Sequence, residues 1–171
     1  TVAVIGPGGM GSNHLALLTA RKDVRLAYVC DVDAVRLAAA AKKVEASEHG
    51  APKTVVDLRK VLDDRSVDAV WIATPDHWHA PAAIMALDAG KHVYVEKPCS
   101  HNVREGRLLV DAARRNGRVC QVGTQARSTP HVREAIQMLR DGVIGDVLVA
   151  KAWNSQLRGN IGKQKPADPP T

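Results

Sequence analysis

Three glycines near the start of the chain, Gly6, Gly8 and Gly11, have a spacing that suits phosphate binding. They follow an apolar run and precede leucines spaced for one face of a helix, which predicts a strand, a tight turn and a helix. Gly6 would permit the turn, Gly8 would let a pyrophosphate approach the backbone, and Gly11 would let the helix pack closely on the strand. Free N–H groups at the positive end of the helix would hold the phosphates. We therefore predict a dinucleotide site, to which Gly9 and Met10 also belong.

An acidic residue after the second apolar run indicates the kind of dinucleotide. Asp31 follows residues 24–29 at about the interval expected for a carboxylate that binds a ribose. It can accept charge-assisted hydrogen bonds from both ribose hydroxyls, whereas it would repel a 2′-phosphate. We therefore predict NAD as the cofactor and favour it over NADP. Asp33 is better explained as the N-cap of a helix that begins near residue 34, and Arg36 could weaken the preference for NAD.

Three further segments, residues 74–79, 96–99 and 123–127, carry polar residues directly after predicted strands. Ligands of parallel α/β sheets bind beyond the carboxyl ends of the strands, so we expect these segments to meet at the nicotinamide end of the dinucleotide. Within them, the ammonium of Lys97 could stabilise a developing alkoxide and exchange a proton with a substrate hydroxyl. The plainer alternative is a surface ion pair between Glu96 and Lys97 at a turn.

Strand and helix patterns alternate along residues 1–123, and this alternation positions the polar segments. Alternation at this spacing predicts a Rossmann-type, doubly wound parallel α/β sheet. The expected strands cover residues 2–5, 24–29, 54–56, 67–73, 92–96 and 119–122. The expected helices cover residues 10–21, 34–47, 57–62, 81–88, 103–116 and 131–140.

The pattern changes after this dinucleotide-binding domain of residues 1–123. Residues 124–153 are predicted to hold a connecting helix and the first strand of a second, truncated substrate domain. That strand is expected at residues 143–153, where apolar and polar residues begin to alternate as in a sheet with one exposed face. Residues 154–171 are rich in Gly, Pro, Gln and Lys without any period, which predicts a loop-like tail.

Composition restricts the classes of partner. The 171-residue chain has a net charge of +6, but its Lys and Arg residues are scattered and are not interleaved with aromatics, so we predict no nucleic-acid partner. Three cysteines in or beside strands indicate reduced thiols. No apolar run approaches the roughly 18 residues that cross a bilayer, and no signal peptide is visible. We expect no membrane partner and a cytoplasmic location, or a periplasmic one if an export signal has been removed upstream.

Several motifs occur together in this sequence: the three glycines, Ala73-Thr74-Pro75, His79, residues 89–95 and, above all, Glu96-Lys97-Pro98. Together they resemble the cofactor domain of the glucose-fructose oxidoreductase and inositol dehydrogenase family, called Gfo/Idh/MocA. The similarity covers about residues 1–150. Residues 76–79 with 123–128 are similar to a subgroup whose members often carry a twin-arginine export signal. The resemblance implies NAD(P)-dependent oxidation or reduction of a sugar, an inositol or a related polyol.

The resemblance also implies roles for individual residues. Glu96 would bond the nicotinamide ribose, and Lys97, as the catalytic residue, would contact the ribose and a substrate oxygen. Pro98 would follow a cis peptide bond that directs the lysine. Thr74 and Pro75 would form a turn that packs against the cofactor.

Other polar residues of the same segments are weaker candidates. The resemblance places His79 near the nicotinamide. His77 is either a substrate contact or a solvent-exposed turn residue, and Trp78 is either a lid or, as we favour, a packing residue. Gln125 and Arg127 are candidate substrate contacts, although an arginine in a polar loop is more often only solvated.

A metal site is the competing interpretation of the histidines. The pairs His77-x-His79 and Cys99-x-His101 could converge at one sheet edge as four ligands. Such short pairs arise easily by chance, however, and the resembling family transfers hydride without metal. We therefore predict no metal.

Members of this family have a second α/β domain that walls the substrate pocket, mediates oligomers and supplies a catalytic histidine, for which this sequence has no counterpart. We expect the chain to be the cofactor domain of a longer, homo-oligomeric sugar or polyol oxidoreductase, or a natural cofactor domain that works with another chain. Two alternatives stay open: a non-catalytic NAD-binding module and an NAD-dependent glycoside-cleaving enzyme.

Overall fold

The computed structural model describes residues 1–154, which fall into two compact units that divide after Gly123. Within the described residues, the first unit holds six strands and five helices, and the second holds one helix. The strands are β1 (Val2–Ile5), β2 (Leu26–Cys30), β3 (Lys53–Val55), β4 (Ala69–Ile72), β5 (His92–Glu96) and β6 (Cys120–Gly123). The helices are α1 (Gly9–Thr19), α2 (Ala34–Glu45), α3 (Arg59–Leu62), α4 (Asp76–Asp88), α5 (Val103–Arg115) and α6 (Pro130–Arg140).

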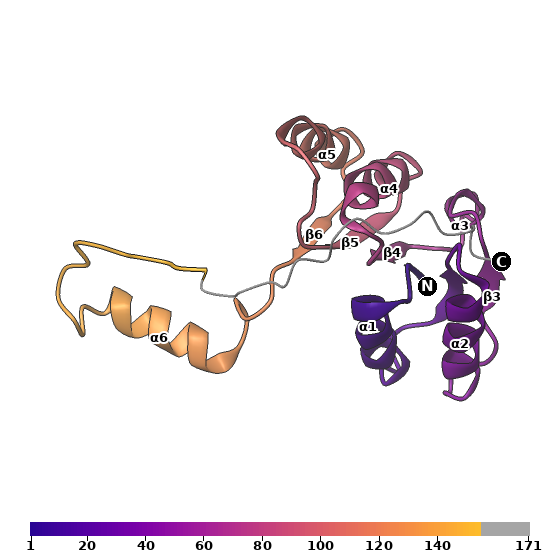
Figure 1. Ribbon diagram of the computed structural model, residues 1–171, viewed down its shortest axis with the longest axis horizontal. Coiled ribbons are helices and arrows are strands. Elements are labelled where there is room, and N and C mark those ends of the chain that lie inside the picture. The colour runs from indigo at the N-terminus through magenta and orange to yellow at the C-terminus, as the bar shows by residue number, and fades with distance from the viewer. Residues whose placement is uncertain (155–171) are drawn as a thin grey trace, which may run out of the picture. The chain divides into compact units, whose positions relative to one another are not determined.

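The strands of the first unit form one parallel sheet in the order β3-β2-β1-β4-β5-β6 (Figure 1). The chain winds outward from β1 to β3, crosses back to β4 and winds outward again to β6. Strand order therefore reverses between β1 and β4, where sheets of this kind bind their ligands. Ile5 pairs with Ile72, so the segments that follow β1 and β4 leave the sheet at the same edge. This arrangement confirms the predicted Rossmann-type, doubly wound parallel sheet.

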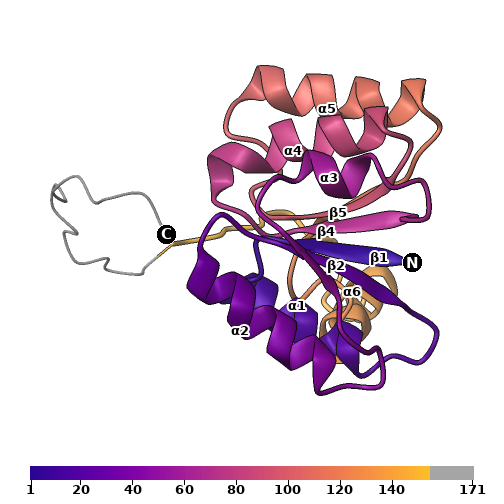
Figure 2. The ribbon, with the colours of Figure 1, turned by 90° about the vertical axis from the view of Figure 1, so that its right-hand side faces the viewer.

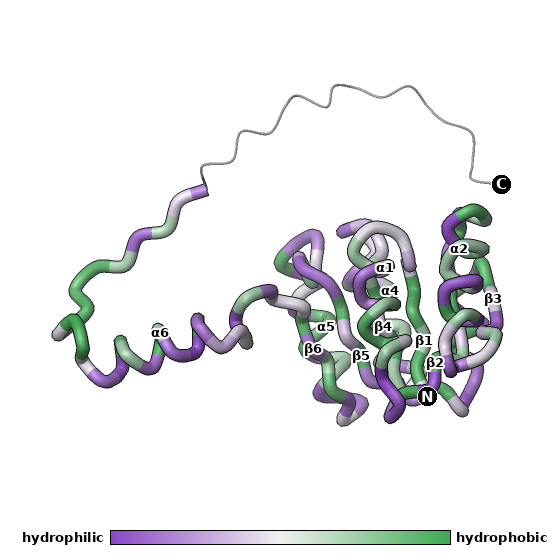
Figure 3. Tube along the Cα trace, turned by 90° about the horizontal axis from the view of Figure 1, so that it is seen from below, coloured by the Kyte–Doolittle hydropathy of each residue, from purple (hydrophilic) through white to green (hydrophobic). Residues whose placement is uncertain are grey.

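Helices cover both faces of this sheet (Figure 2). On one face α1 and α2 contribute Leu15 and Val44 to a buried cluster, and on the other α4 and α5 contribute Leu87 and Leu109 to a second cluster. β1 is buried at every position and is hydrophobic throughout in Figure 3, as expected of a strand covered on both faces. Burying each such side chain stabilises the fold by about 1.5–3 kcal/mol, so the sheet is a firm base for the loops at its edge.

The helix α4 begins five residues earlier than predicted. The sequence predicts that the helix starts near Pro81, with this proline in its first turn, but Pro81 lies inside the helix. A proline is unfavourable there because it lacks an N–H and crowds the preceding turn. Pro75 occupies the N-cap position and the N–H of Trp78 donates to its carbonyl at 2.8 Å, so the first turn is already formed before Pro81. The predicted stop at Gly90, which has a φ of +76°, is confirmed.

The second unit begins at Thr124 and contains α6, which confirms the helix predicted at residues 131–140. The prediction of a strand at residues 143–153 is wrong, because none of these residues is in a strand. Alternating residues form a strand only when a neighbouring strand accepts their backbone hydrogen bonds, and the described part of this unit has none. The apolar side chains of Val147, Leu148 and Val149 are accordingly exposed. Apart from Asn154, the predicted tail of residues 154–171 lies outside the described residues.

No helix within residues 1–154 has the length and apolar character needed to cross a membrane.

Candidate functional site

The glycine turn between β1 and α1 brings three backbone segments close together. Gly6 has a φ of +79°, and a Cβ built on it would lie 2.8 Å from the carbonyl carbon of Ala73, beyond the end of β4. A Cβ on Gly11 would collide with the carbonyl oxygen of Gly6. Any side chain at these two positions would push α1 away from the sheet. By contrast, a Cβ on Gly9 would meet nothing within 4 Å, so the first turn of α1 faces open space.

Asp31 lies directly after β2, at the same sheet edge, and is partly buried. Its Oδ1 accepts a hydrogen bond from the N–H of Asp33 at 2.9 Å, which fixes the carboxylate. Asp33 caps α2 as predicted, since its Oδ1 accepts from the N–H groups of Val35 at 2.9 Å and Arg36 at 3.1 Å. The guanidinium of Arg36 is 3.3 Å from Asp33 and would be 3.1 Å from a Cβ on Gly8, so this cation lies between the turn and the end of β2.

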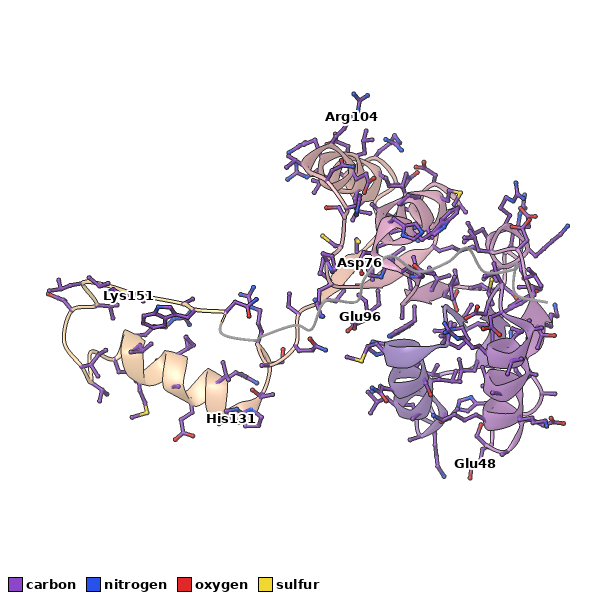
Figure 4. All side chains as sticks on the ribbon, in the orientation of Figure 1. Glu48, Asp76, Glu96, Arg104, His131 and Lys151 are labelled. Carbon is purple, nitrogen blue, oxygen red and sulfur yellow. The ribbon has the colours of Figure 1, made fainter. Side chains whose placement is uncertain are left out.

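Glu96 ends β5 and is buried, with only 4% of its surface exposed. Its Oε1 accepts a hydrogen bond from Nε2 of His14 on α1 at 2.7 Å and another from the hydroxyl of Tyr94 at 3.3 Å. Its Oε2 accepts from the N–H of Lys97 at 3.2 Å. Burial first, and then the charge of Glu96, raise the pKa of Tyr94, which keeps the phenol protonated as a donor. Figure 4 shows Glu96 at the end of β5, on the side toward α1.

Lys97 and Pro98 continue from this buried carboxylate into the solvent. The peptide bond between them is cis, as the resemblance implied. Among the described residues, no group forms a hydrogen bond or an ion pair with the exposed ammonium of Lys97. The carbonyl oxygen of Pro98 accepts a hydrogen bond from Nδ1 of His79 at 2.6 Å. His79 is 1% exposed, so it holds this turn from the interior of the unit.

Two buried polar atoms near this turn have no partner among the described residues. They are Oγ1 of Thr74, after β4, and Nε2 of His79 on α4. Buried polar atoms are normally paired, and an exception at the edge where the glycine turn lies is a reason to expect a bound polar molecule there. With the open space before α1 and the fixed carboxylate of Asp31, these atoms give a dinucleotide both a phosphate cradle and polar contacts. The residues therefore fit this cofactor.

The first turn of α4 holds the remaining candidates of the first unit. Asp76, labelled in Figure 4, begins the helix, and His77 is exposed. Trp78 is 46% exposed, which does not fit the packing role that we favoured. Gln125 and Arg127 belong to the second unit, and their role as substrate contacts stays a prediction.

The competing metal site would need His77, His79, Cys99 and His101 to converge. His79 points one ring nitrogen at the Pro98 carbonyl, Cys99 is half-buried, and His101 is exposed. Within residues 1–154, no three His, Cys, Asp or Glu side chains gather closely enough to hold a metal ion.

Sequence reasoning missed two residues that contact Glu96, namely His14 and Tyr94. Each had a signal that could have revealed it. His14 comes three residues after Gly11, in the turn of α1 next to the glycines. Tyr94 precedes Glu96 by two residues in β5, so both side chains lie on one face of the sheet.

Comparisons with known proteins agree with this geometry. The model of the Gfo/Idh/MocA oxidoreductase family, described by its NAD-binding Rossmann fold, matches residues 1–124. The chain is 34% identical over 162 residues to a glycosyl hydrolase family 109 protein of Saccharopolyspora erythraea, covering 92% of this chain and 35% of that protein. It is 35% identical over 124 residues to the levoglucosan dehydrogenase of Pseudarthrobacter phenanthrenivorans, covering 72% of this chain and 30% of that protein.

A solved structure supports the same relationship. The scyllo-inositol dehydrogenase of Lactobacillus casei, with bound NAD(H) and scyllo-inositol, superposes with a TM-score of 0.76 at 26% identity. The match covers 85% of this chain and 42% of that chain. The chain thus spans about a third of the length of the curated relatives that it matches. Because the family model covers most of the chain and the glycine turn has the geometry that a dinucleotide requires, the chain belongs to the Gfo/Idh/MocA oxidoreductase family and carries its NAD-binding Rossmann domain.

Proposed function

We propose that the protein containing this chain transfers a hydride between NAD and a hydroxyl-bearing carbon of a sugar, an inositol or a related polyol. The chain supplies the cofactor site and the segment Glu96-Lys97-Pro98. The observation that carries this proposal is the exposed Lys97 ammonium, which directly follows a buried carboxylate bonded to the helix of the glycine turn. That location suits a cation that must meet the substrate beside a nicotinamide.

Each cofactor contact has a distinct chemical role. The first turn of α1, with Gly6 to Gly11, holds the pyrophosphate on backbone N–H groups. Asp31 accepts hydrogen bonds from the adenosine ribose. Glu96 binds the nicotinamide ribose, and Thr74 and Pro75 line the cofactor with the unpaired Thr74 hydroxyl as a donor. These contacts orient the cofactor, which supplies the hydride acceptor when bound.

Lys97 acts on the substrate. Its ammonium donates a hydrogen bond to the reacting oxygen and so stabilises the negative charge that develops as the C–H bond breaks. It also exchanges a proton with that oxygen. His77, Gln125 and Arg127 are proposed as further substrate contacts. The exposure of His77 at the start of α4 supports its share of this role.

A direct assay tests this proposal. The complete protein is incubated with NAD+ and a panel of aldoses, anhydrosugars and inositols, and the formation of NADH is followed by absorbance. We expect at least one member of the panel to be oxidised. A protein that binds NAD+ tightly and forms no NADH with any of them would instead be an NAD-binding module without catalysis.

A second candidate function has specific support. The similarity to a glycosyl hydrolase family 109 protein covers 92% of this chain, which favours an NAD-dependent enzyme that cleaves a glycoside. Transient oxidation of the sugar would assist elimination of the aglycone, and reduction after water addition would regenerate NAD+. Release of free sugar from an aryl glycoside without net NADH would establish this function, whereas stoichiometric NADH would exclude it.

A further inference from the structure

Two histidines hold the Glu96-Lys97-Pro98 segment from opposite faces of the sheet. His14 lies on α1, whose side chains pack on one face, and His79 lies on α4, whose side chains pack on the other. The first bonds Oε1 of Glu96 at 2.7 Å and the second bonds the carbonyl oxygen of Pro98 at 2.6 Å. Lys97 stands between these two anchored residues: its backbone N–H donates to Oε2 of Glu96 at 3.2 Å, and its ammonium has no partner among the described residues. The position of its backbone therefore depends on its neighbours.

The carboxylate of Glu96 is confined on its other sides as well. The hydroxyl of Tyr94 donates to Oε1, and Tyr94 is itself stacked on Trp71, with ring centroids 5.7 Å apart. A Cβ on Gly123, at the end of β6, would lie 2.8 Å from the same Oε1. Without the bond from His14, the carboxylate would lose its shortest contact and its link to the helix of the glycine turn.

The two histidines use different ring nitrogens. A carbonyl oxygen can only accept, so His79 must carry a proton on Nδ1, the nitrogen nearer the backbone. The Glu96 carboxylate accepts as well, so His14 must carry a proton on Nε2, the distant nitrogen. The amide NH2 of asparagine imitates the near nitrogen, and that of glutamine imitates the distant one. Asparagine should therefore preserve the hydrogen bond at position 79 and glutamine the one at position 14, and the reverse substitutions should lose it.

We propose that His14 and His79 are positioning residues that together fix Glu96 and Pro98 and thereby direct Lys97 toward the nicotinamide end of the cofactor. This inference rests on the proposed function, in which Glu96 and Lys97 contact the nicotinamide ribose. Neither histidine needs to touch the substrate. His79 acts through the backbone of the turn, and His14 acts through a carboxylate.

Four variants of this 171-residue chain test the inference: His14→Gln, His14→Asn, His79→Asn and His79→Gln. Calorimetry measures the dissociation constants of NAD+ and of ADP, which contains the half that binds the glycine turn but lacks the nicotinamide ribose. We expect His14→Asn and His79→Gln to raise the dissociation constant of NAD+ about tenfold, because each removes one hydrogen bond that fixes the site. The dissociation constant of ADP should not change. We expect His14→Gln and His79→Asn to keep NAD+ affinity within about threefold.

Equal losses of NAD+ and ADP affinity, or equal effects of the two substitutions at each position, would show a general structural role and overturn the inference. Unchanged NAD+ affinity in all four variants would overturn it too. If a variant fails to fold, 15N NMR of the histidine rings in the unmodified chain still decides, because a proton on Nε2 and not on Nδ1 of His79 contradicts the proposed bond. Failure of the proposed function looks different: NAD+ binding follows the rescue pattern, but the complete protein oxidises no sugar.

Discussion

Replacing Asp31 should change the affinities for NAD+ and NADP+ differently, because its carboxylate is the group that would meet a ribose hydroxyl of NAD+ or the 2′-phosphate of NADP+. Oδ1 already accepts the N–H of Asp33 at 2.9 Å, which leaves Oδ2 for the ribose. One charge-assisted hydrogen bond is worth about 1.5–3 kcal/mol. Asp31→Ala should therefore weaken NAD+ binding by about 10- to 150-fold. The affinity for NADP+ should not fall and should rise, because the variant removes the negative charge that repels the 2′-phosphate.

Calorimetric titration of the chain with NAD+ and NADP+ measures both constants, and the ratio of the two cancels any general loss of stability. Asp31→Asn is the matched variant: it keeps an acceptor for Asp33 but removes the charge, so NADP+ should bind more tightly than to the unmodified chain. The positive charge of Arg36, whose guanidinium is 3.3 Å from Asp33, would help to attract the 2′-phosphate of NADP+. As a comparison, Asp33→Ala should cost about 1 kcal/mol of stability through loss of the α2 cap and leave the dissociation constant of NAD+ unchanged. Equal weakening of both dinucleotides by Asp31→Ala would refute the assignment.

Four further outcomes are expected. Lys97→Ala in the complete protein should lower kcat by at least about a hundredfold with little change in the dissociation constant of NAD+, and an unchanged kcat would remove its catalytic role. Gly11→Ala should lower the free energy of unfolding by about 2 kcal/mol or more in urea denaturation, because the methyl group collides with a backbone carbonyl; a neutral effect would mean that α1 can shift freely. Cys30, whose pKa burial raises to about 12, should resist iodoacetamide at neutral pH in the folded chain, and rapid labelling without unfolding would contradict its burial. Hydrogen bonds, above all the one from Ser66, hold the pKa of Asp64 below its usual range. The ionised carboxylate therefore stabilises the fold above about pH 4, and this stabilisation is lost as the pH falls. In Asp64→Asn, the melting temperature should fall less steeply as the pH is lowered through the acid range.

The sheet could be predicted because its information is local. Runs such as residues 2–5 and 69–72 are apolar at every position and contain β-branched residues, which is typical of strands buried on both faces. Glycine and Asp33 mark the ends of helices through conformations and hydrogen bonds within a few residues. The start of α4 could not be found in this way, because Pro81 has a strong local preference that the preceding turn overrides.

Residues 143–153 show where pattern alone fails. Their alternation is real, but a strand also requires a partner, and a pattern within one segment cannot say whether that partner is present. In the described residues of the second unit it is not. The same limit applies to Gln125 and Arg127, whose distance from the cofactor site depends on how two compact units meet.

By itself, the sequence determined the order of strands and helices, the glycine turn, the acidic residue after β2 and the polar segment after β5, because each depends on residue types a few positions apart. Only the tertiary structure decided that Glu96 is buried against His14, which is 82 positions away, and that His79 turns its ring to the Pro98 carbonyl. Such contacts arise when the sheet brings the ends of β1, β4 and β5 to one edge, and which ring nitrogen then meets which oxygen depends on packing that no local spacing encodes.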